Sequence, residues 1–453
     1  MSFIVEKEKQ TPVWDTVDVL VVGSGPGGLA AAIAAARAGV KTVLVERYGC
    51  FGGNLTATGV ESLAWYRHEK TIDTEGIGIE FETRAVEMGA AAPEPQSDSH
   101  ALNTELFKHV ADVLVTEAGV IPVLHCYGVE PVVEGDEVKG VITESKSGRE
   151  AILAKVVIDA TGDADIAHKA GAPCTLMPLK DRQAVTLVFN CCGVDKQRFM
   201  EYIKEDPATY NDWGEDWAQQ TSGLENDMFS PYFEMQFNQA INDKIIEKSE
   251  FDLCGSWSTV TDDGQATYLN LVHLRDVDIT DCRDLTRAEI SGRAEVLEAI
   301  KAMNHTIPGW EKARLRNYAM TLGTRESRKI VGVYDIKGED VMEEGRFEDS
   351  IGIFPEFVDG FGILRLPVTG RYFQVPYGSI LPKRMENLLV AGRAISGDQI
   401  SHAATRNMMC CAVSGQGAGA AAATAVKEGT TVRKVSVSAI QKTLADQGVR
   451  CKY

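Results

Sequence analysis

Three short and almost continuous apolar runs have the pattern of parallel strands that are buried on both faces. They are VDVLVV (17–22), KTVLVE (41–46) and AKVVIDATG (154–162). Between the first two, the small-residue segment LAAAIAAARAG (29–39) predicts a helix that ends at a glycine. The first part of the chain therefore predicts a complete strand–helix–strand unit.

Longer alternating stretches mixed with helical segments fill the middle of the chain. AVTLVFNCC (184–192) and ATYLNLVHLRDVD (266–278) predict antiparallel strands, and residues 285–304 predict a helix. The first pattern then returns, because NLLVAGRAISGD (387–398) reads as a strand and turn, and residues 402–429 read as one small-residue helix.

These patterns predict an α/β fold with two domains. The first is a Rossmann-like domain with a central parallel sheet, built from residues 1–172 and 372–453. It includes a three-stranded meander, which the short apolar runs and turns of 120–145 indicate. The second is an α+β domain with an antiparallel sheet at 173–371, where we expect the substrate to bind.

Composition and charge narrow the classes of partner. The 453 residues carry 46 Lys and Arg against 65 Asp and Glu, a net charge of −19, so the overall field repels nucleic acid and anionic membranes. The ten cysteines form no CxxC pair or metal-ligand spacing, which indicates reduced thiols, a cytoplasmic protein and no metal site. The apolar stretch 17–45 contains charges and a proline and does not read as a membrane span.

The glycine turn GSGPGG (23–28) directly follows the first strand. Gly23 permits a sharp turn, Gly25 lets the backbone approach a pyrophosphate, and Gly28 lets the helix pack against the strand. Glu46, 18 residues after Gly28, is placed to accept hydrogen bonds from ribose hydroxyls. The unit predicts a bound dinucleotide without distinguishing NAD from FAD, and a turn that only packs the strands is the alternative.

Three further segments carry a family resemblance. ERYGCFGGNLTATGV (46–60), VVIDATGDADIAHKAGA (156–172) and NLLVAGRAISGDQISHAATR (387–406) resemble the glutathione-reductase-like class of FAD-binding proteins. Within that class the chain resembles the FAD-dependent oxidoreductase family related to fumarate-reductase-type flavoproteins, to which TRESRKIVGVY (324–334) is also similar. The resemblance spans nearly the whole chain and implies bound FAD.

Two departures from related proteins refine this expectation. Cys50 stands alone after the second strand, where disulfide reductases of this class carry a redox pair of cysteines, so thiol–disulfide chemistry is not expected. The segment GCFGGNLTATG has no histidine for covalent flavin attachment. We therefore expect noncovalent FAD, with a cysteinyl link at Cys50 as the alternative.

The resemblance also implies positions for the FAD contacts. The glycine turn and Glu46 would hold the ADP half, Val129 on the meander would contact adenine through its backbone, and Asp398 would accept from the ribityl or pyrophosphate region. A helix N-cap is the alternative or additional role of Asp398. The full predicted set is Gly23, Gly25, Pro26, Gly27, Gly28, Glu46, Arg47, Gly52, Gly53, Asn54, Val129, Thr161, Gly162, Asp163, Gly392, Asp398 and Met408.

Four residues are candidates for catalysis. The resemblance places His402, at the start of the predicted last helix, beside the isoalloxazine ring, where its intrinsic pKa suits proton transfer near neutral pH. Arg406, one helical turn later, would join it in binding a carboxylate or oxyanion. Arg325 and Arg328 are predicted as a substrate clamp. A capping or FAD-contacting role for His402, and an ion-pair network of the two arginines with Glu326, are the alternatives.

Weaker candidates surround these four. Arg365 and Arg371 are possible clamp residues, and Tyr372 and Tyr377 either cover the flavin or pack in the core. The adjacent Cys410 and Cys411 are interpreted as small core residues, with a strained vicinal disulfide as the alternative.

The expected function is an FAD-dependent hydride transfer between flavin N5 and a small polar organic substrate, by dehydrogenation or by double-bond reduction. The electron acceptor or donor is not specified by the sequence, and a homo-oligomer is an open expectation. An electron-transfer subunit that acts through a protein partner is the main alternative, and a nucleotide-binding structural protein without turnover is the other.

Overall fold

A seven-stranded sheet forms the frame of the protein, as its computed structural model shows for residues 3–5, 8–63, 66–67, 73–93, 99–205, 218–220, 233–249, 251–367 and 370–452. Parallel strands run in the order β5-β2-β1-β8, and β22 pairs with β8 in the same direction. Their bounds are β1 (Val13–Val22), β2 (Thr42–Val45), β5 (Ile121–Val123), β8 (Gly148–Asp159) and β22 (Leu388–Val390). The predicted parallel strands at 17–22, 41–46 and 154–162 are confirmed.

The long strand β8 also belongs to the meander. Its first half pairs antiparallel with β7 (Glu137–Ser145), which pairs with β6 (Tyr127–Glu134), while its second half pairs with β1 and β22. The meander and the parallel sheet are therefore one continuous sheet. The apolar run at 121–123, which the sequence assigned to the meander, instead extends the parallel sheet as β5.

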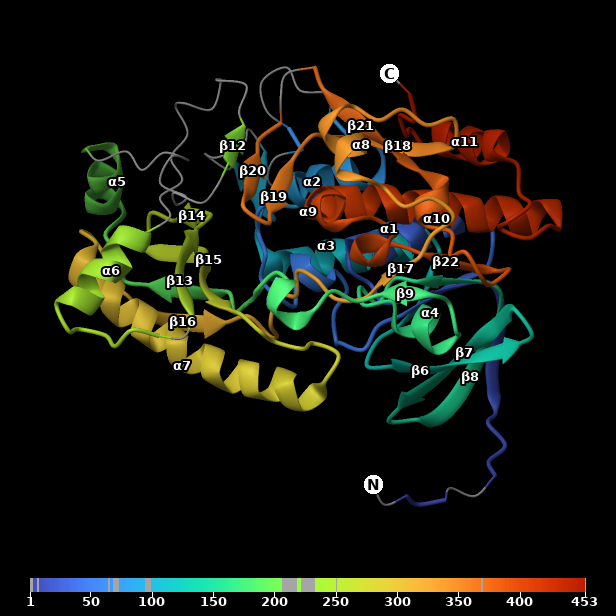
Figure 1. Ribbon diagram of the computed structural model, residues 1–453, viewed down its shortest axis with the longest axis horizontal. Helices are drawn as coiled ribbons and strands as arrows, with labels where there is room; N and C mark the ends of the chain where they lie inside the picture. The colour runs from blue at the N-terminus through green and yellow to red at the C-terminus, as the bar shows by residue number, and fades with distance from the viewer. Residues whose placement is uncertain are drawn as a thin grey trace.

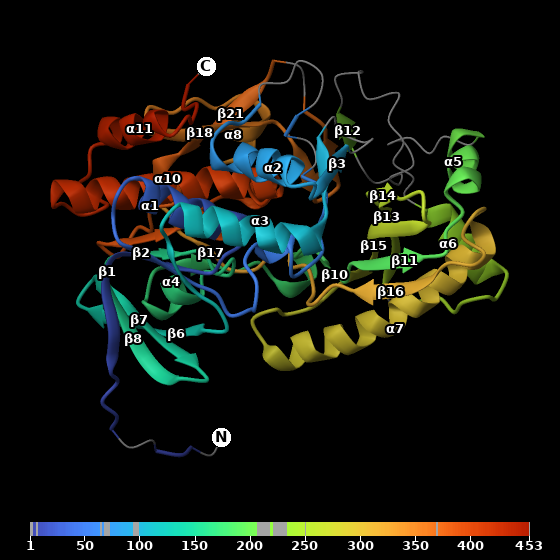
Figure 2. The same cartoon turned by 180° about the vertical axis from the view of Figure 1, so that it is seen from behind.

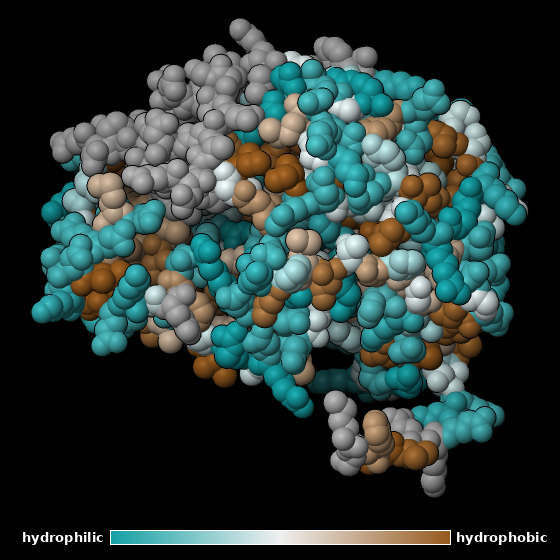
Figure 3. All heavy atoms as spheres, viewed as in Figure 1, coloured by the Kyte–Doolittle hydropathy of each residue, from teal (hydrophilic) through white to brown (hydrophobic). Residues whose placement is uncertain are grey.

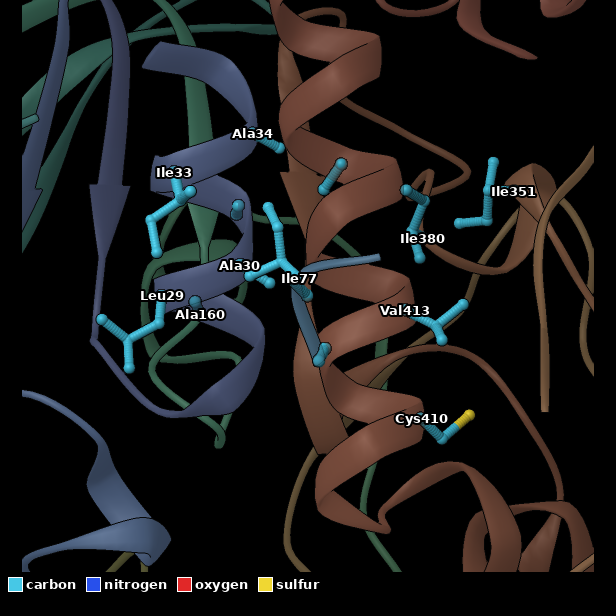
Figure 4. Packing of buried hydrophobic residues seen from close by; sticks show 14 of the residues in the cluster. Leu29, Ala30, Ile33, Ala34, Ile77, Ala160, Ile351, Ile380, Cys410 and Val413 are labelled. Carbon is cyan, nitrogen blue, oxygen red and sulfur yellow. The ribbon is translucent and has the colours of Figure 1, made fainter. Parts of the chain in front are cut away.

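Two small-residue helices lie side by side over this sheet (Figures 1 and 4). They are α1 (Pro26–Arg37) and α10 (Met408–Glu428). A Cβ atom at Gly415 would lie 2.0 Å from the carbonyl oxygen of Gly27, and one at Gly419 would lie 2.2 Å from that of Ala31. The glycines of α10 therefore permit a helix contact that any larger residue would block.

The predicted helix at 402–429 is in fact two helices. The first, α9 (Gln399–Thr405), ends at Arg406, and α10 begins after Asn407. The side-chain amide of Asn407 donates to the carbonyls of Ala403 and Ala404, which closes the end of α9. The prediction of one helix was wrong because the alanine-rich pattern is the same on both sides of this break, and the last helix of the chain is α11 (Val437–Asp446).

On the face seen in Figure 2, α2 (Ile77–Glu87) and α3 (Thr104–Glu117) pack against each other and against α1. The Asn103 side chain caps α3 by accepting from the backbone N–H groups of Glu105 and Leu106. Between α2 and α3, the strands β3 (Ala91–Pro93) and β4 (His100–Leu102) pair with each other, and residues 94–98 lie outside the described residues.

A second, antiparallel sheet lies away from the first one (Figure 1). Its central strand β15 (Gln265–Leu274) pairs with most of the others, and helix α7 (Cys282–Thr306) packs beside it with a separate apolar core. The predicted strands near 184–192 and 266–278 and the helix near 285–304 are confirmed. The other strands are β10 (Val185–Thr186), β11 (Phe189–Cys192), β13 (Asp252–Ser256), β14 (Thr259–Val260) and β16 (Arg314–Tyr318).

Residues 336–366 pack into the core of α1 and α10 rather than into the core of the second sheet. The domain boundaries 1–172, 173–371 and 372–453 stay a prediction. The remaining elements are α4 (Asp165–Lys169), α5 (Lys196–Glu205), α6 (Glu234–Asn242), α8 (Gly338–Met342), β9 (Cys174–Thr175), β12 (Ala218–Gln220), β17 (Lys329–Ile330), β18 (Ser350–Pro355), β19 (Val358–Gly360), β20 (Ile363–Arg365) and β21 (Tyr372–Pro376).

Within the described residues, one helix is long and apolar enough to cross a membrane. It is α10, and 94% of its most apolar window is buried inside the protein, as expected for a core helix. The outer face in Figure 3 is mostly hydrophilic, with scattered apolar groups.

Candidate functional site

The carboxyl ends of β1, β2, β8 and β22 meet at one edge of the first sheet. This edge brings together four of the predicted binding segments, namely the glycine turn, Glu46, residues 160–163 and Gly392. The approach is close, since a Cβ atom at Gly23 would lie 2.4 Å from the carbonyl oxygen of Ala160, and one at Gly27 would lie 2.8 Å from the backbone nitrogen of Gly392. In open α/β sheets this edge is where ligands bind.

The glycine turn leaves the first turn of α1 without an acceptor. Gly25 is the N-cap and supplies no side chain, the first turn contains no acidic residue, and Pro26, Gly27 and Gly28 are buried. A Cβ atom at Gly25 would meet nothing within 4 Å, whereas one at Gly28 would lie 1.9 Å from the carbonyl oxygen of Gly23. The open space at Gly25, beside uncapped N–H groups, fits the pyrophosphate of a dinucleotide.

Glu46 is buried at the end of β2 and orders the turn. Its Oε2 accepts from the backbone N–H of Ser24 (2.9 Å) and from the Ser24 hydroxyl (2.6 Å), and its Oε1 accepts from the N–H of Tyr48 (2.8 Å). A carboxylate offers about four acceptor positions, so one is left for a ribose hydroxyl. The geometry fits the role that the sequence predicts for Glu46.

The segment after β2 folds back over the glycine turn. Gly52 N–H donates to the carbonyl of Ser24 at 2.9 Å, and a Cβ atom at Gly53 would lie 2.8 Å from Cα of Gly25. The backbone carbonyl of Asn54 accepts from Val60 N–H in the turn that follows. Gly52 and Gly53 therefore lie against the glycine turn, and the FAD contact of Asn54 stays a prediction.

Arg47 and Val129 contact residues outside the glycine turn. Arg47 is exposed, with its guanidinium 4.8 Å from the centre of the Tyr48 ring. Val129 falls at an irregularity in the β6–β7 pairing, and its carbonyl accepts from Nζ of Lys169 at 2.6 Å. That carbonyl therefore already has a protein partner, and the predicted contact with adenine stays a prediction.

The turn after β8 is held by the buried carboxylate of Asp159. Its Oδ1 accepts from the N–H and the hydroxyl of Thr161, and its Oδ2 accepts from Ala167 N–H. Burial raises the pKa of Asp159 to about 6. Asp159 thus fixes the 161–163 turn, although the sequence analysis did not select it.

Asp163 connects this turn to two distant segments. Its Oδ1 accepts from the Ser327 hydroxyl (2.6 Å) and from Nη2 of Arg393 (2.7 Å), and its carbonyl accepts from Nε of Arg328 (3.1 Å). The backbone of Gly162 passes so close to Arg393 that a Cβ atom would lie 2.8 Å from the guanidinium. Arg393 was not predicted, although a cation in the turn after a parallel strand was a usable signal.

Asp398 is the N-cap of α9, which was one of its two predicted roles. Its Oδ1 accepts from Ser401 N–H and its Oδ2 from Gly338 N–H, both at 2.8 Å. At the next helix, the Asn407 side chain bonds back to α9 and does not cap α10, so Met408 lies in a first turn without a side-chain acceptor. Flavin contacts of Asp398 and Met408 stay predictions.

His402 lies within α9 and is 1% exposed. Its Nε2 lies 3.1 Å from the carbonyl oxygen of Arg325, and because a carbonyl only accepts, Nε2 carries the proton. Burial, helped by the charges of Lys329 and Arg406, holds the pKa of His402 well below its ordinary value. The fold therefore lowers the pKa of His402 from the intrinsic value on which the prediction rested, and Nδ1 of the neutral ring has no hydrogen-bond partner among the described residues.

The predicted arginines are mostly paired with acids. Arg406 bonds to Asp359 on β19, with Nη2 2.9 Å from Oδ2, and Arg328 forms an ion pair with Asp165. Nη1 of Arg325 donates to the carbonyl of Ala184 at 3.0 Å, at the start of the second sheet. Glu326 accepts from Gln183 N–H. Arg328 and Glu326 therefore each bond to residues outside the predicted ion-pair network of the two arginines with Glu326.

The weaker candidates have structural partners. Arg365 and Arg371 both form ion pairs with the buried Glu356. The Tyr377 hydroxyl donates to the carbonyl of Val432 in the core, and the ring of Tyr372 stacks under the guanidinium of Arg346. Packing thus accounts for both tyrosines.

The cysteines show no sign of redox pairing. Cys410 and Cys411 are buried free thiols, and burial raises the pKa of each. Figure 4 shows Cys410 pointing away from α1. Burial also raises the pKa of Cys50. Over the described ranges, no group of three or more His, Cys, Asp or Glu is arranged to hold a metal ion.

A sequence model of the family described as FAD dependent oxidoreductase matches residues 18–444. The chain belongs to this FAD-dependent oxidoreductase family. It is therefore an FAD-dependent enzyme, and the resemblance drawn from its sequence is confirmed.

Curated relatives match only part of this chain. It is 30% identical over 161 residues to a thiamine thiazole synthase of Metallosphaera sedula, covering 33% of this chain and 55% of the relative. It is 29% identical over 186 residues to digeranylgeranylglycerophospholipid reductase 2 of Methanopyrus kandleri, covering 39% and 45%. A match to a fumarate reductase (cytochrome) of Shewanella frigidimarina, 47% over 57 residues, covers 12% and 10%. Each matched stretch is less than two thirds of the relative.

Solved structures share the fold over nearly the whole chain. A geranylgeranyl bacteriochlorophyll reductase-like protein from Thermoplasma acidophilum has a TM-score of 0.50 at 16% identity, covering 96% of this chain and 84% of that one. A flavin-dependent brominase has a TM-score of 0.52 at 13% identity, covering 96% and 85%. At these identities the likeness establishes the α/β fold.

Proposed function

We propose that this oxidoreductase transfers a hydride between N5 of FAD and a small polar organic substrate, by dehydrogenation or by double-bond reduction. When bound, FAD supplies the hydride acceptor or donor. One observation carries the proposal: His402 on α9, just after the cofactor-binding strands, bonds to the carbonyl of Arg325, whose guanidinium bonds to Ala184 at the start of the second sheet. This junction joins the two halves of the molecule, where pockets commonly form.

The cofactor would be held by the carboxyl edge of the first sheet. The uncapped first turn of α1 would bind the pyrophosphate and the spare acceptor position of Glu46 would bind a ribose hydroxyl. Arg393, held at the same edge by Asp163, adds a positive charge. The residues proposed for the remaining contacts are those that the sequence predicted, and the attachment is proposed to be noncovalent.

The catalytic roles follow from the hydrogen bonds of each group. Neutral His402 presents Nδ1 as a base that accepts the substrate proton, while its Nε2–H anchors the ring. Arg325 would bind a polar group of the substrate. Arg406 and Arg328, which are paired with Asp359 and Asp165, would position the two segments that carry His402 and Arg325.

The substrate is proposed to be a small molecule, and the names of the relatives do not narrow its class. The electron partner, a cytoplasmic location and a homo-oligomeric state stay proposals.

A deuterium experiment tests the proposed reaction. Candidate substrates carrying deuterium at the oxidised carbon are mixed anaerobically with the FAD-loaded enzyme, and flavin bleaching is followed by stopped flow. Hydride transfer predicts that bleaching slows several-fold with the deuterated substrate. The comparison is made at saturating substrate, where the chemical step limits bleaching. Equal rates with both isotopologues under this condition would contradict hydride transfer. Bleaching only after a partner protein is added would favour an electron-transfer subunit.

A further inference from the structure

Partly buried polar contacts connect the second sheet to α9 through Gln183. Its backbone N–H donates to Oε2 of Glu326 at 3.1 Å, and its side-chain Nε2 donates to the carbonyl of Asp359 at 3.4 Å. The same residue, Asp359, binds Nη2 of Arg406 through its carboxylate. Glu326, Gln183, Asp359 and Arg406 therefore form a continuous chain of contacts.

The chain of contacts closes into a ring through His402. Arg406 lies one helical turn after His402, and its N–H donates to the His402 carbonyl. The imidazole Nε2 donates to the carbonyl of Arg325, which is joined to Glu326 by a peptide bond. We call the resulting closed set, consisting of Gln183, Arg325, Glu326, Asp359, His402 and Arg406, the polar ring.

Four side-chain atoms of the polar ring are buried without a hydrogen-bond partner among the described residues. They are Oε1 of Gln183, Oε1 of Glu326, Nδ1 of His402 and Nε of Arg406. Glu326 and His402 are 2% and 1% exposed, so bulk water does not reach them. Leaving a buried polar group unpaired costs about 1–3 kcal/mol, so a small polar ligand that pairs with atoms of this set would stabilise the protein.

The chemistry of the four atoms defines that ligand. Three of them accept a hydrogen bond when Glu326 is ionised, and one donates. An ammonium group would suit the acceptors, but the positive charges of Lys329 and Arg406 act on both Glu326 and His402, and Arg182 and Arg393 add to them. A water molecule is neutral, has two donors and two acceptor positions, and is the usual partner of such groups.

We propose that the polar ring holds one ordered water molecule that bridges Oε1 of Glu326 and Nδ1 of His402. Glu326 is then a positioning residue for His402. After Nδ1 has accepted the substrate proton, it can give a proton to the water while the water gives another to the ionised Glu326 carboxylate, which leaves the water unchanged, and the reverse path returns it. This role rests on the proposed function, whereas the water site does not.

A crystal structure of the FAD-loaded enzyme at a resolution that shows ordered water tests the site directly. The expected result is a water within hydrogen-bonding distance of both atoms. Direct contact between the two side chains, or a ring filled by another protein group, overturns the proposal. This test needs no substrate, so it stays decisive if the proposed reaction fails.

Nitrogen NMR of the ¹⁵N-histidine-labelled, oxidised enzyme tests the coupling. We expect Glu326→Gln, which preserves shape and removes the carboxylate that accepts the proton, to retain FAD and to shift the Nδ1 resonance of His402. The signal of His305, which bonds to Asp243 on the surface, is the internal control. The variant should also lose about tenfold or more in the rate of substrate-driven flavin bleaching, while the surface variant Glu298→Gln should not. An unchanged His402 resonance overturns the coupling.

Discussion

The imidazole of His402 donates its Nε2–H to the backbone carbonyl of Arg325 over 3.1 Å. This single bond fixes the tautomer of the ring, because the carbonyl has no proton to give. It also connects α9 to the segment that follows β16, the last strand of the second sheet. The ring is therefore a neutral acceptor at Nδ1, and the proposed role of His402 as a base rests on this.

Replacing His402 by Asn tests this role. The Asn side chain is shorter and has no basic nitrogen, so we expect turnover to fall by about 10²- to 10⁴-fold. FAD content should stay the same, because the bond of His402 is to the protein backbone. Steady-state kinetics and the 450 nm absorbance per chain (about the flavin maximum) give the two readouts. His305→Asn on the surface is the matched control, and retained turnover in His402→Asn would remove the residue from the mechanism.

Two alanine substitutions in the glycine turn separate cofactor binding from packing. Gly25 has a φ of −58° and open space around its Cβ position, so Gly25→Ala should leave the apoprotein stable and weaken FAD binding. Gly28→Ala would place its Cβ 1.9 Å from the Gly23 carbonyl oxygen. It should therefore lower the free energy of unfolding of the apoprotein by about 1–3 kcal/mol or more. Thermal unfolding of the apoproteins and FAD titration distinguish the two effects. Equal loss of apoprotein stability in both variants would contradict the assignment.

The raised pKa of Asp159 predicts a pH dependence of stability. Because its folded pKa of about 6 exceeds the ordinary value of 3.8, the folded state binds this proton more tightly than the unfolded chain does. The contribution is complete below pH 3.8 and is lost as the pH rises through about 6, a change of about 3 kcal/mol. Urea unfolding across this range should show a flatter pH profile for Asp159→Asn than for the wild type. Parallel profiles would show that Asp159 is ionised throughout.

The thiols should differ sharply in reactivity. Cys282 is exposed, whereas burial raises the pKa of Cys410 and Cys411, so a disulfide-exchange reagent should label Cys282 first and reach the adjacent pair only on unfolding. The double variant Cys410→Ala with Cys411→Ala should keep substrate-driven flavin reduction. Loss of that reduction with FAD still bound would assign the pair a redox role.

Local pattern was enough to predict most of the first sheet. The glycine turn, the small-residue helix and Glu46 lie within thirty residues, where spacing alone constrains the geometry. The break at Arg406 and Asn407 was missed because it depends on hydrogen bonds from Asn407 to α9, which alanine-rich periodicity does not reveal.

Long-range pairing explains what the sequence could not predict. Glu326 and Gln183 are 143 positions apart, and Asp163 and Arg393 are 230 apart, so their contacts depend on the complete fold. The acidic partners of Arg406 and Arg328 also come from distant segments. The low pKa of His402 follows from burial, which its position in the sequence did not disclose.

The most direct test of the proposed flavin chemistry is the visible spectrum of the purified enzyme during anaerobic titration with candidate substrates. We predict a noncovalent flavin that is released as FAD on denaturation. In the wild type, a small polar substrate should bleach the absorbance near 450 nm (about the maximum of oxidised flavin). In His402→Asn this bleaching should be strongly slowed. A colourless protein that cannot be reconstituted with FAD, or a flavin whose bleaching is the same in both proteins, would contradict it.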